Sequence, residues 1–171
     1  MADRMIDLEA LGLRSGQAAR IDMEISPEPP VLGGERLELE TTPIALHIDI
    51  SRTSSGFALR LRGEAVLIGT CARCLGPARL VLEIDAREVE QGGVDPGDEL
   101  SSPYVDDALL DPDAWLHDAL ALGIPERLIC RTDCAGLCAI CGISLNEVTA
   151  GTHVHDRPPD PRFAKLRDLQ E

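Results

Sequence analysis

Hydrophobic and polar residues alternate along several stretches in the first half of the chain. In residues 43–51, every second side chain is apolar: Ile44, Leu46, Ile48 and Ile50. Residues 57–70 and 79–90 repeat this pattern, and residues 19–26 show it more weakly. A period of two is typical of strands with one buried face. Four such strands predict an antiparallel sheet, which would bury its apolar face by forming a barrel or a sandwich.

Glycine and proline mark the ends of these stretches. The Pro- and Gly-rich residues 26–35 predict a connector, and Ser54, Ser55 and Gly56 predict a turn between two strands. Gly63 interrupts the alternation within 57–70 and predicts a bulge or a tight bend.

The pattern changes to a helical period in the second half. Asp111 can cap a helix that has Pro112 at its first position and ends at Gly123. One stripe of this helix contains Trp115, Leu116, Ala119 and Leu120. A second helix is predicted near the C-terminus, where Asp160 and Pro161 repeat the start signal and Phe163, Leu166 and Leu169 share one face.

The predicted fold class is therefore α+β. An antiparallel β-rich, barrel- or sandwich-like N-terminal part is followed by a short helix, a cysteine-rich metal-binding segment and a C-terminal helix. The chain of 171 residues suits one domain overall. Within it we distinguish a β-rich core (1–90), an acidic flexible loop (91–107), and a segment with the helices and the cysteines (108–171).

Charge limits the partners that this chain can bind. Its 16 basic and 30 acidic residues give a net charge of −14, and the pI is about 4.6. Nucleic-acid binding normally needs a basic surface and, for single strands, aromatic stacking platforms. This chain has four aromatic side chains, Phe57, Tyr104, Trp115 and Phe163. We expect no DNA partner; instead, the long-range field favours basic partners.

Residues 1–16 show neither the apolar core of a secretory signal nor its small-residue cleavage site, and no run of about 18 apolar residues predicts a membrane span. We therefore expect a cytoplasmic protein with no membrane association. In that compartment thiols stay reduced, so clustered cysteines indicate metal binding or redox chemistry more often than disulfides.

All six cysteines fall in two groups. Cys71 and Cys74 form one C-x-x-C pair, and Cys138 and Cys141 form another, each with a glycine close behind. Two residues between thiolates allow the backbone to turn around one ion, as in a zinc knuckle. Cys130 and Cys134 make a wider pair, and His153 and His155 follow the second knuckle.

These eight side chains would provide the four ligands that each of two structural Zn²⁺ ions needs. The arrangement we favour joins Cys71 and Cys74 to Cys130 and Cys134, and Cys138 and Cys141 to His153 and His155. In one alternative, Cys130, Cys134, Cys138 and Cys141 share a single ion. In another, the two knuckles pair with each other. The spacing is compatible with one or two ions.

An enzymatic alternative uses the same residues. A thiol-disulfide enzyme needs an exposed cysteine of low pKa, for which Cys71 is the candidate, and a catalytic zinc needs an open coordination position. The chain has an abundance of ligands and no H-E-x-x-H arrangement. We therefore expect structural zinc, no cofactor-binding or catalytic residues, and no enzymatic activity.

The motifs resemble those of a known family. The segment "CARCLGP", then "IPERLICRTDCAGLCAICGISLN", and finally "DPRFAKLRDL" are similar to the YceD family of large ribosomal RNA subunit accumulation proteins. The resemblance implies a β-rich N-terminal portion and a role in accumulation of the large-subunit ribosomal RNA precursor. It also implies an association, often genomic, with a small protein of the large subunit, and no established enzymatic activity.

Charge, cysteines and resemblance together predict a non-enzymatic, zinc-stabilised factor in large-subunit biogenesis. Its acidic surface would hold a basic ribosomal protein or a pre-ribosomal particle. Arg73, Arg127 and Arg131 lie beside the cysteines and offer local contacts to RNA phosphate, but three arginines do not provide tight RNA binding. A DNA-binding zinc ribbon would fit the cysteine spacing but not the charge.

Overall fold

A computed structural model describes residues 4–93, 97–149 and 151–155. The elements in chain order are β1 (Ile6–Asp7), β2 (Ala18–Ile25), β3 (Val31–Leu32), β4 (Glu35–Arg36), β5 (Glu38–Leu39), β6 (Ile44–Arg52), β7 (Gly56–Thr70), β8 (Pro77–Gln91), β9 (Val105–Asp106), β10 (Leu109–Leu110) and α1 (Pro112–Gly123). The predicted C-terminal helix lies outside the described residues. Within them, no helix is long and apolar enough to cross a membrane.

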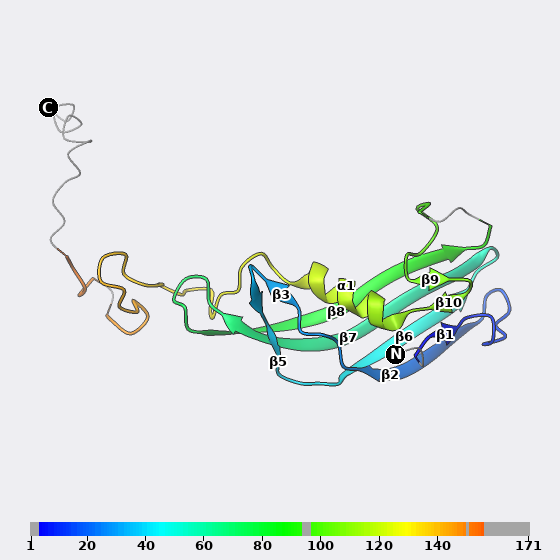
Figure 1. Cartoon of the computed structure of the whole chain (residues 1–171), viewed down its shortest axis with the longest axis horizontal. Helices are drawn as coiled ribbons and strands as arrows, with labels where there is room; N and C mark the ends of the chain where they lie inside the picture. The colour runs from blue at the N-terminus through cyan, green and yellow to red at the C-terminus, as the bar shows by residue number, and fades with distance from the viewer. Residues whose placement is uncertain (1–3, 94–96, 150, 156–171) are drawn as a thin grey trace, which may run out of the picture.

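The main sheet is antiparallel, and its central strand is β7, which forms a long hairpin with β8 (Figure 1). β7 and β8 pair without a break from Gly56 opposite Gln91 to Thr70 opposite Pro77. β6 and the short β5 pair with β7, and β2 pairs with β6. The alternating stretches of the sequence therefore form the predicted strands, because each places its apolar residues on the same face.

The prediction of a bulge or bend at Gly63 is wrong. The register runs through Gly63, which lies opposite Ile84 on β8 and Leu46 on β6. A Cβ atom at this position would lie 2.7 Å from Leu46 Cδ2 and 2.9 Å from the Ala45 carbonyl oxygen. Glycine is needed here because the neighbouring strand comes too close for a side chain.

The apolar face of the sheet is covered by α1, not by a second large sheet. The sheet contributes aliphatic side chains to the core, among them the buried Leu61 and Leu82. The helix buries Trp115, Leu116 and Leu120 in the same core. In the pairing recorded for the described residues, β2 and β8 remain the two long edges of the main sheet. The structure thus differs from the expected barrel or sandwich, because one amphipathic helix and its flanking segments already cover the face.

The start of α1 agrees with its sequence signals. Asp111 accepts hydrogen bonds from the backbone N–H groups of Asp113 and Ala114, both at 3.0 Å. Pro112 occupies the first turn, where the absence of its N–H costs nothing. The Tyr104 ring stacks on Trp115 with 6.0 Å between centroids, and thereby closes one end of the core. Beside it, β1, β10 and β9 form a small three-stranded sheet.

The solvent face of the sheet is crossed by ion pairs. Asp49 on β6 contacts Arg20 at 2.7 Å and Arg62 at 2.6 Å. Arg60 contacts Asp85 at 2.7 Å, and this hydrogen-bonded pair lowers the pKa of the Asp85 carboxyl to about 2. Paired arginines of this kind mainly neutralise neighbouring carboxylates, because exposed pairs are screened by water and contribute little to stability.

Candidate metal centres

The first cysteine group lies at the tip of the β7–β8 hairpin. Cys71 and Cys74 belong to the turn between the two strands, and Cys130 and Cys134 come from the segment after α1. All four Sγ atoms lie within 4.8 Å of one another. The Sγ–Sγ distances are 3.9 Å for Cys71–Cys134 and 3.7 Å for Cys74–Cys130. A tetrahedral zinc ion with Zn–S bonds of about 2.3 Å separates its sulfurs by about 3.8 Å, so the four thiols fit zinc.

Backbone contacts hold the two parts of this group together. The Ala72 N–H donates to the Leu128 carbonyl at 2.8 Å, and the Arg73 side chain donates to the Cys134 carbonyl at 3.0 Å. Gly136 has a φ of +77°, and a Cβ atom there would lie 3.1 Å from the Arg73 carbonyl oxygen. The segment after α1 therefore packs closely on the hairpin tip. Cys71 is fully buried and Cys134 is 3% exposed, whereas Cys74 and Cys130 are half-buried.

The second group is local and less buried than the first: Cys141 is exposed, and the other three residues are half-buried. Cys138, Cys141, His153 and His155 bring their ligand atoms within 4.8 Å of one another. Cys141 Sγ lies 3.2 Å from His153 Nε2, which is 2.9 Å from His155 Nε2. Two thiols and two imidazoles are a common ligand set of structural zinc. In Figure 1 this segment, drawn in orange, lies beyond the hairpin tip and away from the sheet.

The two knuckles share one local geometry. Cys71 N–H donates to the Gly76 carbonyl at 2.8 Å, and Cys138 N–H donates to the Ile143 carbonyl at 2.9 Å, five residues on in each case. The residue two positions after the first cysteine of each pair, Arg73 or Ile140, points its N–H at that cysteine's sulfur. Each turn therefore directs backbone N–H groups at sulfur, an arrangement that favours the thiolate form which metals bind.

The two knuckles differ in the amino acid that follows the second cysteine, which is Leu75 in the first knuckle and Gly142 in the second. The residue after the second cysteine is left-handed in both, with a φ of +74° at Gly142 and +59° at Leu75. This conformation costs a residue other than glycine roughly 1–2 kcal/mol. Leu75 nevertheless occupies it with a side chain that is 67% exposed. The first knuckle thus keeps its geometry despite this local strain.

The pKa values of the cysteines follow from these contacts. Burial opposes ionisation of Cys71, but N–H groups of Cys74, Cys130 and Arg73 outweigh it and lower its pKa to about 6. The N–H groups of Cys141 and Ile140 lower the pKa of Cys138 to about 6. In contrast, burial and the neighbouring thiols raise the pKa of Cys130 to about 12. A cation bound between the sulfurs would stabilise the thiolate form of neighbouring cysteines at the same time.

Comparison with known proteins assigns the chain to a family. The sequence model described as "Large ribosomal RNA subunit accumulation protein YceD" matches residues 59–170, which include most of β7, all of β8 and α1, and both cysteine groups. The chain belongs to the YceD family. This membership implies a role in accumulation of the large-subunit ribosomal RNA. It confirms the resemblance seen in the motifs.

The YceD-family protein also has similar relatives in mycobacteria. Uncharacterized proteins of Mycobacterium bovis and Mycobacterium tuberculosis are 28% identical to it over 169 residues, which cover 96% of this chain and 80% of theirs. An uncharacterized protein of Mycobacterium leprae is 28% identical over 170 residues, covering 96% of this chain and 76% of the relative. No solved structure gives a significant match.

In this YceD-family chain, the cysteines and histidines are grouped in the arrangement that we favoured among the three that the spacing allows: Cys71, Cys74, Cys130 and Cys134 in one cluster, and Cys138, Cys141, His153 and His155 in the other. The alternatives that join Cys130 with Cys138, or one knuckle with the other, do not describe this geometry. Both clusters could bind metal ions such as zinc. That they do so stays a prediction.

Two other expectations need revision. Cys71 is fully buried, so it is a poor candidate for the reactive thiol of an enzyme; Cys141 is the exposed cysteine. Two of the arginines considered for RNA contact are engaged within the protein: Arg73 bonds Cys134, and Arg131 bonds Asn146 at 3.0 Å. Asn146, which also donates to Cys134 Sγ at 3.4 Å, was missed because a single asparagine carries no spacing signal.

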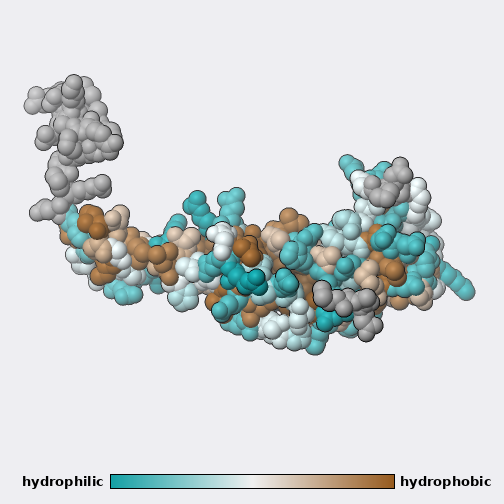
Figure 2. Space-filling model, in the orientation of Figure 1, coloured by the Kyte–Doolittle hydropathy of each residue, from teal (hydrophilic) through white to brown (hydrophobic). Residues whose placement is uncertain are grey.

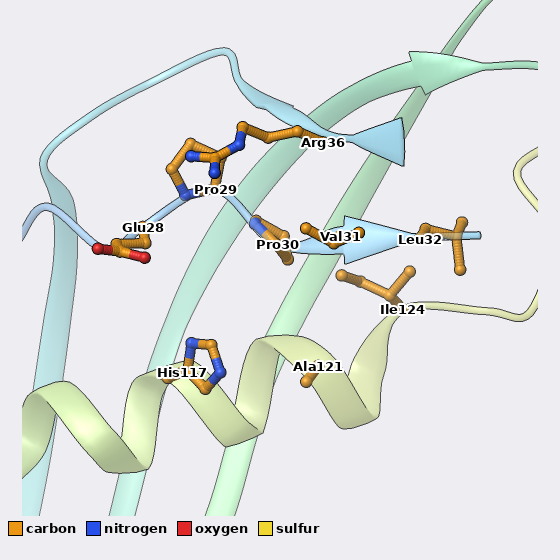
Figure 3. A pocket seen from close by; sticks show the side chains of 9 residues that line it. All are labelled: Glu28, Pro29, Pro30, Val31, Leu32, Arg36, His117, Ala121 and Ile124. Carbon is orange, nitrogen blue, oxygen red and sulfur yellow. The ribbon is translucent and has the colours of Figure 1, made fainter. Parts of the chain in front are cut away.

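Two cavities lie beside α1, away from the candidate metal centres. The smaller, about 330 Å³, lies where His117, Ala121 and Ile124 face Pro30 and Val31 (Figure 3). The larger, about 900 Å³, shares Glu28 and His117 with it and also contacts Asp111 and Asp113. None of the predicted metal ligands lines these cavities. The carboxylates that do are those of Glu28, Asp111 and Asp113.

Proposed function

We propose that this protein acts in large-subunit biogenesis as a non-enzymatic, zinc-stabilised docking protein for a basic ribosomal protein or a pre-ribosomal particle. The observation that carries this proposal is the distribution of charge. Residues 1–125 contain 23 of the 30 acidic residues and 10 of the 16 basic ones. Seven of these ten arginines are in ion pairs with carboxylates. The body therefore presents its excess of negative charge to a partner.

Two carboxylates illustrate this excess. Glu64 on β7 and Glu83 on β8 lie directly opposite each other in the sheet, and both are exposed. Within the described residues, no ion pair involves either of them. Like charges in directly opposite positions destabilise a sheet. A basic partner that binds this face of the sheet would remove this cost.

Structural zinc fits the two clusters better than catalytic zinc. Each cluster offers four candidate ligands, whereas a catalytic zinc keeps one position open for water or substrate. Four thiolates around one Zn²⁺ leave a net charge of −2, so metal binding would not make the protein attractive to RNA phosphate. Because Arg73 and Arg131 are already engaged, direct RNA contact is expected to be weak.

The surface near the second cluster differs from the body. Ile140, Ile143 and Val154 are 56%, 42% and 79% exposed. Figure 2 shows hydrophobic side chains gathered at this end of the molecule, whereas the body has a mixture of hydrophilic and hydrophobic areas on the same face. The charge that would attract a basic partner is thus located on the sheet and α1, apart from the metal clusters.

The double substitution Glu64→Gln/Glu83→Gln tests the docking proposal. We expect association with a basic large-subunit protein to slow by roughly 3- to 10-fold, because two unpaired charges that steer the encounter are removed. The fold should not be destabilised, since the substitution removes a repulsion. Association rates of the full-length protein with individually purified large-subunit proteins, and with naked large-subunit rRNA, provide the measurement.

The matched control is Arg60→Gln/Asp85→Asn, which removes a paired arginine and carboxylate and leaves the net charge unchanged. It should leave the association rate unchanged. Tight, steeply salt-dependent binding to naked rRNA, combined with no binding to any basic protein, would contradict the proposal.

A further inference from the structure

Asn146 lies between the two candidate metal centres and contacts the first one directly. Its Oδ1 accepts hydrogen bonds from the Ala135 N–H at 2.8 Å and from Arg131 Nη2 at 3.0 Å. Its Nδ2 donates to Cys134 Sγ at 3.4 Å. The two donors on the oxygen fix the orientation of the amide, because only the oxygen can accept from them. The NH₂ group therefore faces the sulfur.

The position of Asn146 depends on the second cluster. It belongs to the chain segment that returns from the second knuckle, and this segment pairs with the residues before the knuckle. Leu137 and Ser144 form an antiparallel bridge, and the Leu145 N–H donates to the Gly136 carbonyl at 2.8 Å. The knuckle between them is closed by Cys138 and Cys141, whose partners His153 and His155 come from the same local segment.

We propose that Asn146 couples the two metal sites energetically. Metal at the Cys138–His155 site holds the return segment in place, and the return segment keeps the Asn146 amide on Cys134. The N–H donated to this thiolate strengthens metal binding at the first site. Coupling of this kind is reciprocal, so metal at the first site also favours metal at the second. The inference rests on the proposed zinc binding of both clusters.

Hydrogen bonds to metal ligands commonly change metal affinity by about 10- to 100-fold. We therefore expect Asn146→Ala to weaken metal binding at the four-cysteine site by this factor in the full-length protein. The affinity would be measured by competition with a chelator, using cobalt(II), whose absorption bands differ between four-thiolate and two-thiolate sites. Glu147→Gln is the matched control: it changes the adjacent exposed side chain and should leave both affinities unchanged.

A double-mutant cycle isolates the coupling. Cys141→Ser removes a ligand of the second site and should weaken the first site by about the same factor as Asn146→Ala. Because both changes break one connection, the double variant should be no weaker than Asn146→Ala alone. If the two effects instead multiply, or if Asn146→Ala has no effect on the first site, the coupling proposal is overturned.

Asn146→Asp separates the hydrogen bond from general packing. Aspartate can still accept from Ala135 and Arg131 but cannot donate to Cys134, so it should weaken the first site at least as much as alanine. A wild-type affinity in this variant would contradict the role of the N–H donor. A wild-type protein that binds two ions without coupling would refute only this inference, whereas one that binds no metal would also refute the zinc part of the proposed function.

Discussion

Replacement of Cys134 by serine is expected to detach the segment after α1 from the hairpin tip. Structural zinc supplies on the order of 10 kcal/mol of apparent folding free energy, and this substitution would remove a buried candidate ligand of the first site. The remaining attachment would consist of the buried Leu128 and a few hydrogen bonds, which together provide about 2–4 kcal/mol. The sheet and α1 have their own core and should remain folded.

Limited trypsin digestion measures this effect, because Arg127 and Arg131 lie within the segment that would be released. In the Cys134→Ser protein, cleavage at these arginines should be much faster than in the wild type, and the zinc content should fall. The control is Cys141→Ser, which alters the second cluster. With zinc in excess the first site should stay occupied in this variant even at a weaker affinity, so the segment around Arg127 should stay protected. Equal protection in the Cys134→Ser and wild-type proteins would contradict the anchoring role of the first site.

Replacement of Trp115 by alanine should have the largest effect on the body of the protein. Trp115 is 1% exposed, belongs to the central core and stacks on Tyr104. Truncation of a buried tryptophan leaves a large cavity and commonly costs about 3–5 kcal/mol. Such a loss is a large part of the roughly 5–15 kcal/mol that stabilises an ordinary domain.

Urea denaturation followed by circular dichroism measures this loss as a change in the free energy of unfolding. Leu122→Ala on the same helix is the matched control, since Leu122 is 85% exposed and alanine favours helix formation. It should change stability by less than about 0.5 kcal/mol. If Trp115→Ala were equally mild, the helix could not be the element that covers the sheet.

The sequence allowed correct prediction of the elements that depend on local pattern. Alternation identified the strands that became β6, β7 and β8, because one face of each strand is buried along much of its length. The Asp111–Pro112 start and the Gly123 end of α1 were readable because a cap and a proline act within one helical turn. The eight candidate ligand side chains lie in the arrangement that we favoured, although their spacing alone allowed two others.

Features that depend on distant contacts were not predictable in this way. The sheet stays open because α1 covers its apolar face, and periodicity does not indicate which element covers which. Gly63 was misread because its role comes from Leu46 on a neighbouring strand. Asn146 contacts Cys134 across twelve residues of sequence, and no spacing rule marks a hydrogen-bond donor to a metal ligand.

The metal content of the full-length protein, purified under reducing conditions, tests the central claim most directly. The account predicts two zinc ions per chain. Their removal by a chelator should expose Arg127 and Arg131 to trypsin while the circular dichroism of the sheet persists. A protein that contains no transition metal, yet protects these arginines equally well before and after chelation, would contradict it.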